Sequence, residues 1–239
     1  MHELKRLLDD CDSFAAAAWI EQQGPPQEAV EMYRQAALWL YNEHKDVPGM
    51  VAVSHAGIQF GLDHARRCAA TDPEASAKLK GTAKAIAFNL GSNTWTGWND
   101  DGIILTDSDL RAGLDEARLN LRLAVELERG DEPLAIAYWL LGAHELARGR
   151  CATANEQFHT AAAHAAATGK QDMELMLRGY EALAGLRADP AAEAARRDFD
   201  SRVDALRAGG SDDGRFYAGQ LSTARDVFTG RAAQSADRP

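Results

Sequence analysis

The residues best suited to chemistry lie in one loop, residues 93–102, which reads NTWTGWNDDG. Trp95 and Trp98 stand close together there, and Asp100 and Asp101 follow them directly. Aromatic faces beside carboxylates suit a cationic or sugar-like group. One interpretation is therefore a small-ligand-binding or enzymatic domain centred on the Trp95–Gly102 segment. The other, which we favour, is that both tryptophans fold back over a hairpin end and the acidic stretch forms an ordinary turn.

Metal ligands do not recur at the spacings that metal sites need. A calcium loop built around Gly102 would lack both its first acidic ligand and its final bidentate glutamate. Glu156 and His159 form one Glu-x-x-His motif, whereas a di-iron helical bundle needs two such motifs on separate helices. The sequence therefore predicts neither a metal site nor a cofactor.

Candidate nucleophiles are few and isolated. Cys11, Cys68 and Cys151 are widely spaced and form no C-x-x-C motif, which argues against a disulfide framework or a zinc site. We expect each to be a small buried residue, although a Cys11 or Cys151 nucleophile with a distant histidine stays open. No phosphate-binding or nucleophile-elbow motif is present, and the dipeptide Ser54-His55 indicates nothing by itself. The sequence favours a non-catalytic protein but leaves an enzymatic role open.

Composition narrows the classes of partner. The chain has 239 residues and a formal net charge of −10, which argues against nucleic acid or an anionic membrane as the main partner. The first residues lack the apolar run of a signal peptide, and no stretch approaches the ~18 apolar residues of a membrane span. We therefore expect a cytoplasmic protein that binds neither nucleic acid nor membranes.

Almost every segment has the apolar period of an α-helix, with Gly, Pro or capping residues between segments. In the first segment, Leu7, Leu8, Cys11, Phe14 and Ala15 share the face expected to be buried. The sequence predicts an all-α fold in one domain over residues 1–228, followed by a disordered tail at 229–239. The expected helices cover approximately residues 4–22, 27–45, 50–70, 73–90, 107–129, 131–148, 150–168, 172–186, 190–208 and 213–228.

One segment, residues 135–168, has the spacing of a repeated helical hairpin. Small residues stand where two helix backbones must approach, and an aromatic residue stands where a wedge between them must be filled. The residues that carry this pattern are Tyr138, Leu141, Gly142, Gly149, Ala154, Phe158 and Ala161. On these positions the segment resembles the tetratricopeptide repeat family. Two positions depart from the family pattern, Glu145 in place of tyrosine and Ala166 in place of proline.

The resemblance implies a right-handed α-α superhelix, a TPR-like stack of about four antiparallel hairpins with a capping helix at each end. The hairpins would pair the second helix with the third, the fourth with the fifth, the sixth with the seventh and the eighth with the ninth. The alternative is an irregular helical bundle in which only residues 135–168 match by chance.

The resemblance also implies a function, namely a scaffold that binds a protein or peptide on an apolar concave face. The first helix of each hairpin would line that face, and acidic residues would steer basic partners. The partner-binding residues expected on this basis are Ile136, Trp139 and Ala143 with Arg34, Leu38 and Tyr41. Self-association of such apolar faces into a homodimer is a further possibility.

Overall fold

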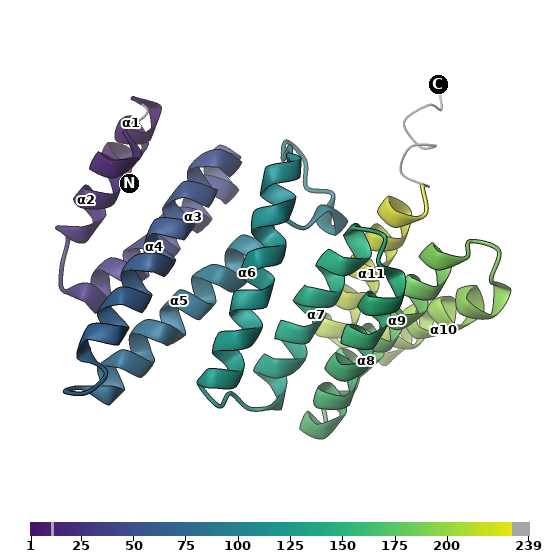
Figure 1. The fold of residues 1–239 in the computed structure, drawn as a ribbon. Coiled ribbons are helices and arrows are strands. Elements are labelled where there is room, and N and C mark those ends of the chain that lie inside the picture. The colour runs from purple at the N-terminus through teal and green to yellow at the C-terminus, as the bar shows by residue number, and fades with distance from the viewer. Residues whose placement is uncertain (11, 231–239) are drawn as a thin grey trace. The chain divides into compact units, whose positions relative to one another are not determined.

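A computed structural model describes residues 1–10 and 12–230. In this part of the chain the secondary structure consists of eleven α-helices and one short 3-10 helix, with no strand, so the all-α prediction is confirmed (Figure 1). The helices are α1 (His2–Asp9), α2 (Ser13–Glu21), α3 (Pro26–His44), α4 (Val47–Cys68), α5 (Pro73–Asn93), η1 (Thr96–Trp98), α6 (Asp107–Glu126), α7 (Asp131–Ala147), α8 (Cys151–Thr168), α9 (Gln171–Ala188), α10 (Glu193–Gly209) and α11 (Asp212–Phe228). The tail expected at 229–239 lies outside the described residues beyond Gly230.

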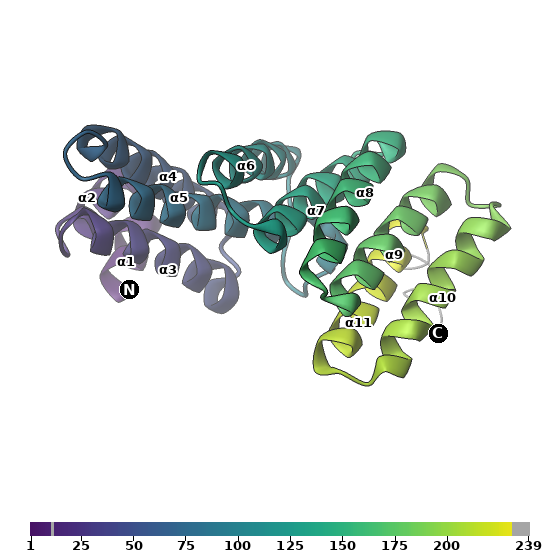
Figure 2. The ribbon, with the colours of Figure 1, turned by 90° about the horizontal axis from the view of Figure 1, so that it is seen from below.

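Contacts within the chain form two compact units. Unit 1 contains Met1–Thr94 and Gly102–Glu128, and unit 2 contains Trp95–Asp101 and the chain from Arg129 onward. The single domain expected over residues 1–228 stays a prediction. Each of the four expected hairpins has its two helices packed together: α3 with α4 and α5 with α6 in unit 1, and α7 with α8 and α9 with α10 in unit 2 (Figure 2).

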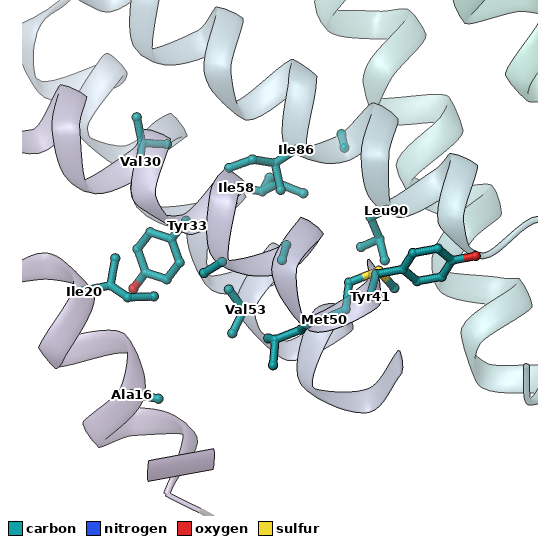
Figure 3. Close-up of a cluster of buried hydrophobic side chains, with 14 of the residues drawn as sticks. Ala16, Ile20, Val30, Tyr33, Tyr41, Met50, Val53, Ile58, Ile86 and Leu90 are labelled. Carbon is teal, nitrogen blue, oxygen red and sulfur yellow. The ribbon is translucent and has the colours of Figure 1, made fainter. Parts of the chain in front are cut away.

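The prediction of a single first helix over residues 4–22 is wrong, because the structure has two helices there, α1 and α2. The side chain of Asp12 accepts a hydrogen bond from the backbone N–H of Ala15 at 2.7 Å, which starts a new helix. The new helix turns Ala16 and Ile20 toward the core, and Ile20 lies beside Tyr33 of α3 (Figure 3). Phe14, expected on the buried face, is instead 89 % exposed.

The third predicted helix also begins earlier than expected. This helix was expected over about residues 50–70, but α4 begins at Val47, because the carboxylate of Asp46 accepts the Gly49 N–H at 2.9 Å and caps the helix. Pro48 is compatible with the first turn, where its missing N–H has no helical partner.

The core of unit 1 lies between α3, α4 and α5, with α2 covering one side. Glycines on α4 let these helices approach closely. A Cβ atom added at Gly57 would lie 2.5 Å from the Cβ of Tyr33 and 3.1 Å from the Cδ1 of Ile86. The same addition at Gly61 would lie 2.9 Å from a methyl group of Val30. Side chains at these two positions would therefore force α4 away from its neighbours.

Unit 2 is built by α7–α11, each packed on the next helix along the chain, with α11 also packed on α9. The α7–α8 hairpin has the close approach that its small residues predicted. A Cβ atom at Gly142 would lie 2.8 Å from the ring of Phe158, and Ala154 on α8 is fully buried. The 3-10 helix η1, which precedes α6 in the sequence, packs against α7 and α11 of this unit.

Candidate functional site

Unit 2 contains an aromatic cluster made of Trp95, Trp98, Trp139, Tyr180 and Phe228. Trp95 lies at its centre, with ring centroids 5.6 Å from Trp139, 6.0 Å from Tyr180 and 5.9 Å from Phe228. The last three residues come from α7, α9 and α11, so a single indole contacts three helices. All three pairs are edge-on or tilted, as aromatic rings prefer. Only 1 % of Trp95 is exposed, which makes it a core residue of unit 2.

Two further contacts fix Trp95 in this place. Its indole Nε1–H donates a hydrogen bond to the carbonyl oxygen of Ala143 at 3.0 Å. The backbone of η1 folds tightly against the same ring, since a Cβ at Gly97 would lie only 2.2 Å from it. Only glycine fits there without displacing the indole. The loop is therefore held inside unit 2 by its first tryptophan.

Three of the predicted partner-binding residues lie on α7 beside this cluster. Trp139 is 5 % exposed and Ala143 is fully buried, while Ile136 is half-buried. Trp95 contacts the first two directly, through its ring and its hydrogen bond. Trp95 of the same chain therefore covers Trp139 and Ala143, two of the residues expected to contact a partner.

The four residues of the alternative ligand site are not gathered at one exposed surface. Trp95 points into the core and Trp98 is half-buried against it, with ring centroids 5.1 Å apart. Asp100 and Asp101 are both exposed. A cationic or sugar-like ligand, as predicted for this loop in the alternative interpretation, would need an exposed aromatic face, and Trp95 has none.

The other three predicted partner-binding residues lie on α3 in unit 1. Arg34 forms an ion pair with Glu31 at 2.6 Å, and this hydrogen-bonded pairing lowers the pKa of Glu31. Tyr41 is only 6 % exposed, and the Nζ of Lys45 lies 5.9 Å from its ring centroid. Leu38 is half-buried. Of the three, only Leu38 offers a partly open apolar side chain.

A surface that the sequence did not predict lies between α2 and α4 of unit 1. At one end a hollow of about 150 Å³ is mostly apolar, and Phe14 stands at its edge. At the other end a second hollow of about 330 Å³ is mostly polar, and the two share Ala56. We call them the apolar hollow and the polar hollow of the α2–α4 groove. The apolar hollow is lined by Leu8, Ser13, Phe14, Ala17, Tyr33, Ala52, Val53 and Ala56, and the polar hollow by Glu21, Ala56, Gln59, Phe60, Asp63, His64 and Arg67.

The order of lining residues shows that α2 and α4 run in the same direction. Phe14 and Ala17 lie at the apolar end with Ala52, and Glu21 lies at the polar end with Asp63. The antiparallel helix α3 connects them and supplies Tyr33 to the apolar hollow.

Tyr33 is held rigidly beneath the groove. Its hydroxyl donates to the carboxylate of Glu21 at 3.1 Å and lies 3.3 Å from the carbonyl oxygen of Ala17. Burial, together with the nearby Glu21 charge, raises the pKa of Tyr33 well above its usual value. The ring of Phe60 lies 5.9 Å from that of Tyr33 and 4.3 Å from that of His64. The groove therefore has a preformed, aromatic floor.

One signal in the sequence could have identified this groove. Residues 13–20 contain no charged residue, and residues 47–62 contain no Asp, Glu, Lys or Arg. A helix that is apolar all round is normally buried on every side. In α2, however, Phe14 and Ala18 stay exposed. Exposed apolar positions on such a helix make it a candidate interaction surface when they form one contiguous patch.

Ser54 and His55 on α4 of unit 1 are not arranged as a nucleophile and its base. Ser54 is fully buried and its hydroxyl has no hydrogen-bond partner. Ser54 and His55 are consecutive on α4, and consecutive side chains on a helix do not face each other. His55 instead lies with its Nε2 3.5 Å from a carboxylate oxygen of Glu116. Burial raises the pKa of Glu116 to about 7, with a smaller contribution from Asp115.

The Glu-x-x-His motif of α8 lies at the surface, with both Glu156 and His159 exposed. His159 is exposed, and its Nδ1 lies 2.8 Å from the carboxylate of Glu181 on α9, which also accepts a hydrogen bond from Arg178 at 3.0 Å. Within the described residues, no group of three or more His, Cys, Asp or Glu side chains is placed to hold a metal ion. Cys68 and Cys151 are half-buried thiols, and Cys11 lies outside the described residues.

Across the described residues, none of the helices combines the length and the apolar character that a membrane span requires. A scan against protein-family models found no match for this chain, and searches of curated proteins and of solved structures found none either.

Proposed function

We propose that this chain is a non-catalytic helical-repeat scaffold that binds a protein or peptide partner in the α2–α4 groove. The observation that carries the proposal is the apolar hollow with the exposed Phe14 beside it. A largely exposed phenylalanine next to an apolar concavity is costly in water and is typical of an interaction surface. The original expectation, a partner on the face of Trp139, is less well supported because Trp95 covers that residue.

We also propose that the hairpins are degenerate TPR-like units. The close contact of Gly142 with Phe158, the buried Ala154 and the parallel course of α2 and α4 support this. In a stack of such units, alternate helices run parallel, and the groove between two of them suits an extended or helical segment of a partner.

Binding would follow from burial of apolar side chains. Filling the apolar hollow with a partner side chain would contribute about 1.5–3 kcal/mol to the free energy of binding, the usual gain for burying one large apolar group. The polar hollow, with Glu21, Asp63 and Arg67 around it, would fix the direction of the bound segment. The rigid floor formed by Tyr33 reduces the cost of ordering the site.

Selection of binding peptides from a random displayed library on the full chain tests this proposal. Peptides that use the groove should share an aromatic or aliphatic anchor and should lose binding to an Ala56→Leu variant, in which the hollow is filled. A Val125→Ala variant, altered at an exposed apolar position of α6, is the control and should bind normally. Selected peptides that bind Ala56→Leu unchanged but fail on Leu38→Asp would instead place the partner on α3 and refute the groove.

A further inference from the structure

We propose that the occupant of the α2–α4 groove is a second copy of this chain, with Phe14 of each copy inserted into the apolar hollow of the other. This inference rests on the proposed function and names its partner. It follows from a projecting ring and an apolar hollow that lie side by side on one surface of unit 1.

The projection and the hollow match in size. Phe14 is 89 % exposed, so nearly the whole ring projects from α2. The apolar hollow measures about 150 Å³, which is the volume of a protein cavity known to accommodate one benzene ring. A two-fold symmetric interface requires the same patch to carry both complementary halves. Phe14 and the hollow beside it satisfy that requirement.

The charge distribution also favours a second copy on this surface. Two chains that each carry a net charge of −10 repel each other, so close approach needs an uncharged contact surface. The helix segments that border the apolar hollow, residues 13–20 and 47–62, contain no Asp, Glu, Lys or Arg. Charged side chains flank these segments at both ends, Asp12 and Asp46 before them and Glu21 and Asp63 after them, where they would form the rim of the interface.

Small side chains surround the projecting ring and allow the backbones of two copies to approach. Ala17, Ala18, Ala52 and Ala56 lie exposed or half-buried around Phe14 on α2 and α4. The chain's own C-terminal segment is a poorer occupant, because residues 231–239 contain neither an aromatic nor a large aliphatic residue. An aromatic side chain supplied by an identical partner fills the hollow better.

Sedimentation velocity of the full chain, from low to high micromolar concentration, tests the proposal. The wild type should shift from the monomer mass of 25.9 kDa to twice that mass as concentration rises. Phe14→Ala should raise the dimer dissociation constant at least a hundred-fold, or about 2.8 kcal/mol, because a symmetric dimer loses two buried rings at once. Ala56→Leu should also weaken the dimer, since it fills the hollow and leaves Phe14 in place.

Phe216→Ala is the matched control, because Phe216 is a 62 % exposed phenylalanine on α11 of unit 2. It should dimerise as the wild type does. A wild type that stays monomeric throughout, or a Phe14→Ala variant that dimerises normally, overturns the inference. Either result leaves the proposed function intact, because the loss of peptide binding in Ala56→Leu is measured independently of the oligomeric state of the chain.

Discussion

Replacing Trp95 by alanine should destabilise unit 2 far more than an ordinary loop substitution would. Truncating a fully buried large aromatic residue costs about 3–5 kcal/mol. Loss of the hydrogen bond from its Nε1 to the Ala143 carbonyl adds about 1 kcal/mol. The expected loss of about 4–6 kcal/mol is a large share of the 5–15 kcal/mol that stabilises a typical domain.

Urea unfolding followed by far-UV circular dichroism measures this loss without relying on the tryptophan that has been removed. Two compact units can unfold in separate steps, so each transition is fitted by itself. Trp95→Phe is the informative companion, because it keeps a buried ring while removing the Nε1 donor and part of the indole's volume; it should cost clearly less than Trp95→Ala. A Trp95→Ala variant within about 1 kcal/mol of the wild type would refute the reasoning that this indole is a core residue.

Three further outcomes follow from single contacts. Gly142→Ala should cost about 1–3 kcal/mol in thermal unfolding, because the new methyl group would lie 2.8 Å from the ring of Phe158. Burial in the folded chain raises the pKa of Glu116 from 4.5 to about 7. The folded state therefore binds the proton more tightly than the unfolded state, and the free energy of unfolding falls as pH rises from about 4.5 to 7. Glu116→Gln should therefore match the wild type below pH 4.5 and exceed its stability by roughly 3 kcal/mol at pH 8; equal stabilities at pH 8 would contradict this. Asp12→Ala removes the acceptor for the Ala15 N–H and should cost about 1 kcal/mol in urea titration, whereas Asp12→Asn should cost less.

Local patterns predicted the helical content of this chain well. The α7–α8 hairpin was identified from Gly142, Ala154 and Phe158, because a close helix crossing can be inferred from small residues at helical spacing. Caps such as Thr106, which forms a reciprocal capping box with Asp109, are equally local signals. The break before α2 was missed because an Asp cap inside a run of helix-forming residues is a weak signal, outweighed by the apolar period around it.

Contacts between distant residues could not be predicted in the same way. Trp95 and Trp139 are far apart in the sequence, and no local pattern says which faces of α7, α9 and α11 meet η1. The α2–α4 groove depends in the same way on which side of α2 faces Tyr33. Periodicity identifies an apolar face but not the partner that covers it, and for α2 it placed Phe14 on the wrong side.

The path of the chain limits how unit 2 could be isolated. Trp95–Asp101 belongs to unit 2, yet the chain returns to unit 1 for Gly102–Glu128 before it enters unit 2 again. A fragment that begins at Arg129 would therefore lack the indole around which α7, α9 and α11 gather, and would leave an empty space among Trp139, Tyr180 and Phe228. One proteolytic cut between the units cannot release unit 2 intact, and expression of this half alone would need residues 95–101 to be supplied, for example as a fused or added peptide.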